Sequence, residues 1–259
     1  MEKLVKTKRL TSDDMRNMAN NTKYEWSIDD VEKVIVDKDK DEEDTNEFLT
    51  AKHPFRAVII GRSGSGKTIL TLNLLLKYLK YDCIYIICST VHLQPKYDLI
   101  CDLAELFPSK FKIFSSMAAF HLKNVCKTKR NLVLLDDIQE LDNENMRRVN
   151  ELYVKGRHSN ISVIWLGQNY FKIPIRARGS ANMFVFFKVN SSRELGRIHS
   201  EVCSDMSREA FEKLFRSATE EEEGDPNSKF SCLVIDTEQK EDCMRYRRNF
   251  KQLYLCNLE

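Results

Sequence analysis

The stretch that decides the fold runs from Phe55 to Lys80 and reads FRAVII (55–60), GRSGSGKT (61–68) and ILTLNLLLKYLK (69–80). The first part is an apolar run broken only by Arg56, which is typical of a buried strand. The leucines of the last part form a broad apolar surface and predict a helix over 67–80. The octapeptide between them fits the pattern G-x-x-x-x-G-K-[ST] at every fixed position. It therefore stands between a strand and a helix, the setting that a phosphate-binding loop requires.

The chemistry of this loop follows from its residue types. Glycine lets the backbone curl so that successive N–H groups point at phosphate oxygens, and the helix N-terminus adds partial positive charge. The Lys67 ammonium can reach the β- and γ-phosphates, and the Thr68 hydroxyl can ligate Mg²⁺. We therefore expect ATP and Mg²⁺ as cofactors. The expected nucleotide-binding residues are Gly61, Arg62, Ser63, Gly64, Ser65, Gly66, Lys67 and Thr68.

A second candidate element is LVLLDD (132–137), an apolar strand that ends in two carboxylates. Such a pair suits a Walker B site, in which Asp136 holds Mg²⁺ with Thr68 and Asp137 polarises the attacking water. The alternative is an ordinary Asp-Asp turn after a buried strand. The phosphate loop favours the functional interpretation, and a second acid beside the metal acid favours hydrolysis by water.

Two further polar residues are candidate site residues because of their position next to a predicted strand. Gln168 comes just after the apolar run 161–166, and such a residue points into the crevice where open α/β sheets bind ligands. It could sense the γ-phosphate, or it could be an ordinary loop glutamine. Arg157 lies in the tripeptide Gly-Arg-His before that run. It could neutralise phosphoryl charge, in cis or from a neighbouring subunit, although a surface arginine is the simpler interpretation of the residue alone.

Apolar runs alternate with amphipathic stretches along the rest of the chain, which indicates an α/β fold with a mostly parallel sheet covered by helices on both faces. Further strands are expected at 83–88, 111–114, 132–135, 161–166, 183–187, 230–235 and near 244–254. Further helices are expected at 96–106, 116–127, 142–155, 191–201 and 207–217. The organisation predicted is a charged N-terminal arm (1–50) and a P-loop core with a C-terminal strand extension (51–259).

The composition indicates which classes of protein the chain can belong to. The 259 residues carry 41 basic and 39 acidic side chains, and 42% are hydrophobic, which is a globular mixture. No apolar run is long enough for a membrane helix, so we expect no membrane partner. The arm is net −5, with 9 basic and 14 acidic side chains. Eight cysteines show no zinc-ligand spacing, and several lie in apolar runs, which favours structural thiols in a reducing interior.

Four elements in order make the chain resemble a known family: GRSGSGKT, LVLLDD, GRHSNISVIWLGQ (156–168) and IPIRARGSANMFVFFKVNSSRELGRI (173–198). Together they resemble the poxvirus-type genome-packaging ATPases of the FtsK–HerA superfamily, over about residues 53–217. The resemblance implies a RecA-like P-loop ATPase of the additional-strand type, in which the glutamine strand lies between the phosphate-loop strand and the Walker B strand. It also implies a homo-oligomeric ring that hydrolyses ATP and moves double-stranded DNA into a capsid.

The resemblance assigns roles residue by residue. Lys67 and Thr68 bind phosphates and Mg²⁺, Asp136 is the metal acid, Asp137 activates water, Gln168 is the sensor and Arg157 resembles a trans-acting arginine finger. The chain departs from cellular members at Asp137, where they usually carry Glu. The implied partners are double-stranded DNA, gripped without regard to sequence, and a capsid or portal-type vertex protein. The implied location is the assembly site in the host cytoplasm, or the virion.

The candidate DNA contacts form three basic clusters. They are Lys123, Lys127, Lys129 and Arg130; Arg176 and Arg178; and Arg245, Arg247, Arg248 and Lys251. The segment after Gln168 is favoured, because a loop next to the sensor can transmit hydrolysis to DNA. Alternatives are a nucleotide or nucleoside kinase, a non-translocating nucleotide-binding protein of the capsid, and a helicase. The arm either docks on a protein partner or packs on the core.

Overall fold

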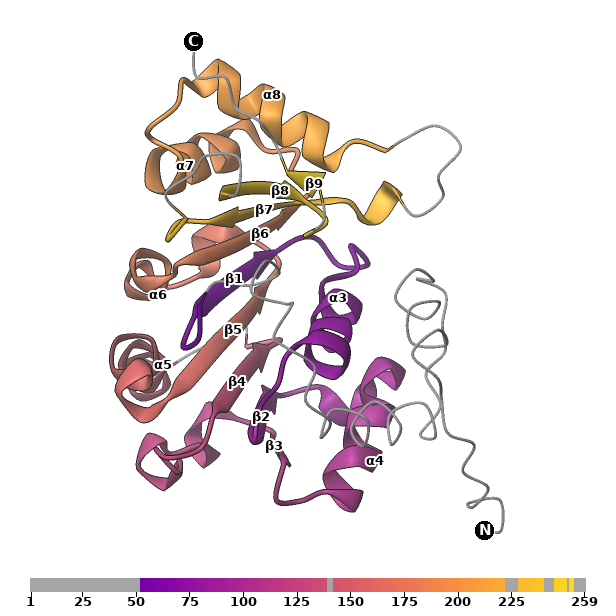
Figure 1. The fold of residues 1–259 in the computed structure, drawn as a ribbon, viewed down its shortest axis with the longest axis vertical. Helices are drawn as coiled ribbons and strands as arrows, with labels where there is room; N and C mark the ends of the chain where they lie inside the picture. The colour runs from indigo at the N-terminus through magenta and orange to yellow at the C-terminus, as the bar shows by residue number, and fades with distance from the viewer. Residues whose placement is uncertain (1–51, 139–141, 222–227, 240–244, 251, 254–259) are drawn as a thin grey trace.

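A computed structural model of the chain describes residues 52–138, 142–221, 228–239, 245–250 and 252–253. The expected N-terminal arm lies outside the described residues. The described strands form one sheet in the order β3-β2-β4-β5-β1-β6-β7-β8-β9 (Figure 1). Their bounds are β1 Arg56–Ile60, β2 Cys83–Cys88, β3 Phe111–Phe114, β4 Asn131–Asp136, β5 Ile161–Gly167, β6 Met183–Phe187, β7 Cys232–Asp236, β8 Tyr246–Arg248 and β9 Gln252–Leu253.

Neighbouring strands from β3 to β6 all pair in parallel. β5 lies between β1 and β4, so the glutamine strand separates the phosphate-loop strand from the acidic strand, as the resemblance implies. β7, β8 and β9 continue the sheet in antiparallel fashion beyond β6. These three C-terminal strands therefore extend the sheet on the side of β1 that carries β6. The expectation of a mostly parallel sheet is therefore confirmed.

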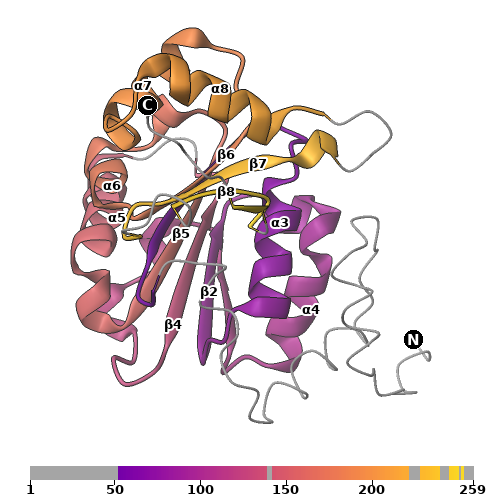
Figure 2. The ribbon, with the colours of Figure 1, turned by 45° about the horizontal axis from the view of Figure 1, so that its top comes forward.

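Helices cover both faces of this sheet, which divides the core in two (Figure 2). α3 (Lys67–Asn73) and α4 (Asp98–Leu106) pack on one face. The other face carries α5 (Asn143–Lys155), α6 (Ile175–Ser180), α7 (Ser192–Val202) and α8 (Arg208–Thr219). Alternate residues of each strand serve opposite faces: in β1, Ala57 and Ile59 join the first core, and Val58 and Ile60 join the second. Strands buried on both sides explain the uninterrupted apolar runs.

Helix starts follow capping rules. The side chain of Asp142 accepts a hydrogen bond from the backbone N–H of Asn145 at the start of α5. Ser191 and Ser207 do the same at the starts of α7 and α8. Each cap satisfies one of the N–H groups that the first turn leaves without a partner. None of the helices in the described ranges is long and apolar enough to cross a bilayer.

Two sequence expectations need correction. The stretch 116–127 is not a helix; it forms two short 3₁₀ turns, Met117–Ala119 and Leu122–Asn124. The buried ring of Phe120 packs edge-on against Tyr85 and Phe114, and this anchor to the sheet interrupts helical continuation. The helix expected over 67–80 is α-helical only to Asn73 and continues as a π-turn, Leu74–Tyr78. The wider turn brings the three consecutive leucines 74–76 toward the core, where all are buried.

Candidate nucleotide-binding site

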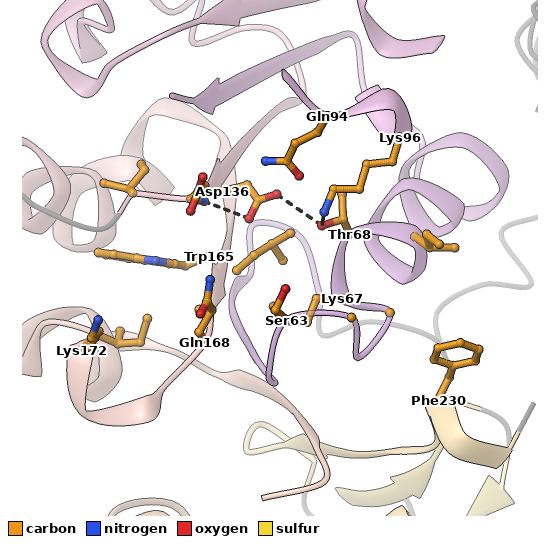
Figure 3. Close-up of a pocket in the computed structure, with 18 residues that line it drawn as sticks. Ser63, Lys67, Thr68, Gln94, Lys96, Asp136, Trp165, Gln168, Lys172 and Phe230 are labelled. Carbon is orange, nitrogen blue, oxygen red and sulfur yellow. Dashed lines mark hydrogen bonds between the residues drawn. The ribbon is translucent and has the colours of Figure 1, made fainter. Parts of the chain in front are cut away.

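The candidate site lies at the carboxyl ends of the parallel strands, where open α/β sheets bind ligands. A cavity of about 540 Å³ opens there, between the phosphate loop, the ends of β4 and β5, and the segment after β2 (Figure 3). Its lining includes eight of the predicted functional residues, together with others described below. These eight are Ser63, Gly64, Gly66, Lys67, Thr68, Asp136, Asp137 and Gln168.

The phosphate loop depends on its glycines for two different reasons. Gly64 and Gly66 have positive φ values of 76° and 95°, which L-residues with a side chain rarely adopt. Gly61 has an ordinary φ but no room: a Cβ there would lie 2.8 Å from the Phe187 side chain and 2.5 Å from Ser65 Oγ. The loop is therefore curled by two glycines and packed against β6 by the third.

Lys67 opens α3 and folds back over the loop. Its Nζ donates to the carbonyl oxygens of Gly61 and Arg62, at 2.6 and 2.7 Å. Burial lowers the pKa of this ammonium, while the charge of Asp136 raises it. The carbonyls of the loop hold the lysine inside it, so the ammonium is already where phosphate oxygens would meet the backbone N–H groups. Arg62 itself is exposed.

Thr68 and Asp136 meet although they are 68 residues apart, with 3.3 Å between Thr68 Oγ1 and Asp136 Oδ2. The Tyr97 hydroxyl donates to the same carboxylate oxygen. Lys96 Nζ donates to Thr68 Oγ1 at 3.0 Å, and the two side chains lie side by side in Figure 3. Burial and the neighbouring carboxylate both raise the pKa of Tyr97, so it stays a neutral donor. A hydroxyl and a carboxylate on the cavity wall are hard oxygen donors of the kind that Mg²⁺ prefers, so the site fits this ion.

Asp137 has a left-handed backbone, with φ at 52°, and its N–H donates to Asp136 Oδ1 at 2.9 Å. Thr90 Oγ1 donates to Asp137 Oδ2 at 2.6 Å, and Ser89 Oγ donates to its backbone carbonyl at 3.1 Å. Gln94 donates in turn to Thr90 Oγ1. A non-glycine residue in this region of φ is uncommon and is often found at functional sites. The segment after β2 thus fixes the direction of the second carboxylate.

Gln168 follows β5 directly, is exposed and lines the cavity. In Figure 3 its amide lies beside Trp165, on the side of the cavity that carries Asp136. Lys172, also exposed, adds a cation to the same wall. The glutamine is therefore brought to the acidic pair by strand order, as the sequence indicates.

Arg157 lies elsewhere. It is exposed in the 3₁₀ turn Gly156–Ser159, which precedes β5, whereas the cavity lies beyond the end of that strand. At about 3.3 Å a residue, β5 separates the arginine from its own cavity by roughly 20 Å. Arg56 is the first residue of β1 and Arg157 precedes β5, so both lie at the amino edge of the sheet, the side where the parallel strands begin. Burial, and then the charge of Arg157, lower the pKa of Arg56. A role in cis is therefore incompatible with the fold.

The basic clusters differ in availability. Arg178 is buried and belongs to the core: it pairs with Glu201 at 2.9 Å and donates to the carbonyls of Tyr170 and Ile173. Its neighbour Arg176 is exposed. The C-terminal cluster is also engaged internally, because Arg245 pairs with Asp205 and the buried Arg247 lies 3.9 Å from Asp236. Lys251 lies outside the described residues.

Arg248 of that cluster donates to the carbonyl of Glu220 and to Ser231. The first cluster is different: Lys123, Lys127 and Lys129 are exposed, and Arg130 is half-buried above the ring of Tyr81. Lys127, Lys129 and Arg130 precede β4 and so lie toward the amino edge of the sheet.

Sequence reasoning missed several residues of the site. Gln94 and Lys96 from the segment after β2, and Phe230 from the turn before β7, line the cavity. Thr90 and Tyr97 do not line it, but they donate hydrogen bonds to Asp137 and Asp136. No motif marks these residues. For the segment after β2 the signal is position: β2 pairs with β4, so residues that follow β2 must lie beside the acidic pair.

Comparison with known proteins agrees with this geometry. The sequence model of the family described as "Poxvirus A32 protein" matches residues 43–218, more than half of the chain. The chain belongs to the poxvirus A32 family. The resemblance stated from the motifs is thereby confirmed at the level of family.

Curated proteins similar to this chain include several named DNA packaging protein OPG160. The Monkeypox virus protein is 31% identical over 162 residues, which cover 54% of this chain and 50% of the relative. The protein of Vaccinia virus (strain Copenhagen) is 30% identical over the same length and 56% of it is covered. The chain thus spans about half the length of the curated relatives it matches.

Solved structures with the same fold include B204, the DNA-packaging ATPase from Sulfolobus Turreted Icosahedral Virus. It is 17% identical with a TM-score of 0.54, and the match covers 78% of this chain and 99% of that one. The genome packaging NTPase B204 from Sulfolobus turreted icosahedral virus 2, in complex with ATP-gammaS, gives 16% and a TM-score of 0.50 over the same shares. At these identities the likeness establishes the fold, a P-loop ATPase fold with a mostly parallel sheet.

Proposed function

We propose that this chain is an ATP-hydrolysing motor that moves double-stranded DNA, and that its task is to package a viral genome into a preformed capsid. The observation that carries the proposal is the meeting of Thr68 with Asp136, 3.3 Å apart beside Lys67 in one cavity. A phosphate loop and an acidic strand end are the parts that nucleotide hydrolysis needs. Membership of a family whose relatives are named DNA packaging proteins supports the choice of DNA.

In this mechanism the chain's own residues bind and orient. The loop N–H groups and Lys67, once released from the carbonyls of Gly61 and Arg62, hold the β- and γ-phosphates. Thr68 and Asp136 would hold Mg²⁺, which when bound neutralises charge on the phosphate oxygens. Asp137, oriented by Thr90, accepts a proton from the attacking water, and Gln168 contacts the γ-phosphate end.

Arg157 completes the site only from a neighbouring subunit, since it lies at the opposite edge of its own sheet. A guanidinium beside the terminal phosphate would stabilise the transferring group. The proposal therefore includes a homo-oligomeric ring in which each exposed Arg157 faces the next subunit's cavity.

DNA should be gripped through its phosphates, because the expected contacts are exposed lysines and arginines rather than a base-reading element. With Arg178 buried, the candidates next to the sensor are Lys172 and Arg176.

The acidic arm 1–50 is repelled by DNA, so we propose that it contacts a capsid or vertex protein at the assembly site. Deleting 1–44 should leave ATP hydrolysis intact and abolish association with capsids; an insoluble product would assign the arm to the core.

The proposed activity is tested by measuring phosphate release with and without duplex DNA, in parallel with nucleosides and nucleotides as acceptors. We expect DNA-stimulated release that is independent of DNA sequence and falls steeply with salt. Lys67→Ala should abolish it, since the charge that faces the phosphates is lost, whereas Lys80→Ala, beyond the end of the same helical segment, should not. Phosphate transfer to a small acceptor, without an effect of DNA, would instead identify a kinase.

A further inference from the structure

The wall of the cavity farthest from the acidic pair contains an aromatic ring. Phe230 ends the 3₁₀ turn Ser228–Phe230, which leads into β7, and its ring is half-buried. It lines the cavity together with Gly66 and the 46% exposed side chain of Ile69. The contact with the loop is close: a Cβ on Gly66 would lie 3.1 Å from the Phe230 ring. The proposed mechanism gives this ring no role.

Strand order places the two ends of the cavity on opposite sides of the phosphate loop. The acidic pair follows β4, which is separated from β1 by β5, whereas Phe230 precedes β7, which is separated from β1 by β6. Figure 3 shows the same arrangement, with Asp136 and Gln168 on one side of the loop and Phe230 on the other. A ligand that crosses the loop therefore meets carboxylates at one end and an aromatic ring at the other.

The chemistry of a nucleoside triphosphate fits this polarity in one direction. Its terminal phosphate requires the metal-binding oxygens of Thr68 and Asp136, which lie at the acidic end. The triphosphate is a chain with the nucleoside at its far end, so the base is directed toward Phe230. Lys229 Nζ lies 4.9 Å from the centre of the same ring, within the range of a cation–π contact.

We infer that Phe230 is the base-binding residue of this protein, stacking on the nucleobase while Ile69 adds apolar contact. The inference rests on the proposed function, since it presupposes that a nucleoside triphosphate occupies the cavity. Every base has a π-face, so a stack of this kind is tolerant of base identity. The site should therefore accept ATP and GTP with similar affinity, and bind the smaller pyrimidine triphosphates less tightly.

The test compares ATP with tripolyphosphate, which has the phosphates without the base. Titration calorimetry of the full chain with Mg²⁺ should show that Phe230→Ala weakens ATP binding about 5- to 100-fold, the range that stacking on one aromatic ring supplies. Tripolyphosphate affinity should not change. In steady-state assays the same variant should raise KM for ATP with kcat largely kept. Phe230→Trp should retain or improve ATP affinity, because the larger ring stacks at least as well.

Two controls separate base binding from support of the loop. Phe230→Leu keeps apolar volume against Gly66 and removes the ring, so it should lose ATP affinity and keep tripolyphosphate affinity even if the alanine variant fails to fold. Phe171→Ala removes another exposed ring, one that is not part of the cavity wall, and should leave both affinities unchanged.

The outcomes are distinct. Equal losses of ATP and tripolyphosphate affinity in Phe230→Leu would show that the ring only supports the loop, and would overturn the inference. Unchanged affinity for both ligands in that variant would overturn it as well, with the proposed function left standing. Wild-type protein that binds neither ligand would overturn the proposed function and the base contact together.

Discussion

The direction of Asp137 is set by one backbone angle and one hydroxyl. Its backbone is left-handed, with φ at 52°, and Thr90 holds the carboxylate with a 2.6 Å hydrogen bond. Asp is one methylene shorter than the Glu that cellular members of the superfamily usually carry. In the proposed mechanism a rigid support matters more for a short side chain, because that side chain positions the attacking water.

Asp137→Asn should keep ATP binding and lower hydrolysis by about 10²- to 10⁴-fold, the usual contribution of a positioned base. The amide keeps the hydrogen bond to Thr90 in shape but cannot take a proton. Binding is measured by calorimetry and hydrolysis by phosphate release. Asp102→Asn, on the exposed face of α4, should change neither quantity. If ATP binding disappeared with hydrolysis, Asp137 would be reassigned to a metal or structural role.

The cysteines offer a second residue-scale prediction, this time on pH. Hydrogen bonds from Thr128, 3.1 Å away, lower the pKa of the exposed Cys126 thiol, whereas burial raises the pKa of Cys232 to about 12. Only the thiolate reacts with iodoacetamide, so the rate of Cys126 labelling should reach half its maximum at a lower pH than the rate for an ordinary exposed cysteine does. Cys232 should stay unlabelled in the native protein.

Mass spectrometry of the individual peptides measures this labelling across a pH series. Thr128→Val should shift the Cys126 profile to higher pH and leave the other described cysteines unchanged. A Cys232 peptide labelled as fast as the Cys126 peptide would contradict the burial on which the prediction depends.

At the scale of elements, Arg178 of α6 ties that helix to the preceding turn and to α7. Arg178 stacks on the ring of Tyr170, donates to carbonyls of the preceding turn and pairs with Glu201 of α7. The turn that it anchors follows Gln168 directly. The position of Gln168 thus depends on the contact between Arg178 and Glu201 as well as on β5.

Arg178→Ala should lower the free energy of unfolding by about 3 kcal/mol, because it leaves buried carbonyls and a carboxylate without their partner. The measurement is urea denaturation followed by circular dichroism. Arg176→Ala, two residues away and exposed, should stay within about 0.5 kcal/mol of the wild type. If the two variants were equally stable, Arg178 would be a surface cation and would return to the DNA-binding candidates.

The strands were predictable because each is buried on both faces and reads as a continuous apolar run. The phosphate loop, the acidic pair and Gln168 were predictable because their chemistry is local to a motif or a strand end. Lys96 and Phe230 were not, since they reach the cavity only through strand order, which periodicity does not reveal. The burial of Arg178 was hidden for a similar reason, since its partner Glu201 lies 23 residues away.

For the whole molecule, the proposed function makes ATPase activity a property of an assembly, because Arg157 is separated from its own cavity. Mixing Arg157→Ala with Lys67→Ala subunits should restore part of the ATPase activity that each variant lacks alone. In a mixed ring some intact cavities face intact arginines, because one variant keeps the loop and the other keeps the guanidinium. The measurement is phosphate release against mixing ratio, with mass measurement of the ring in ATP.

The matched control for this experiment is a mixture of Lys67→Ala with Lys67→Ala,Arg157→Ala subunits, in which no cavity is intact and no activity should return. If no ratio of the two single variants exceeded either one alone, the trans assignment would lose its support. The arginine would then be a solvated surface residue of the amino edge.

The central place of β1 also has a consequence for how the chain is made. The backbone N–H of Phe55, just before β1, donates a hydrogen bond to Ser162 Oγ, 107 residues along the chain. The N–H of Arg56 donates to Asn182 Oδ1, 126 residues along the chain. A ribosome adds about 5–20 residues per second, so the apolar strand waits roughly 5–20 s for its first neighbour. During that interval both of its edges are open to wrong pairing. The phosphate loop is thus translated early yet shaped late, and nucleotide can stabilise the fold only after β5 and β6 have left the ribosome.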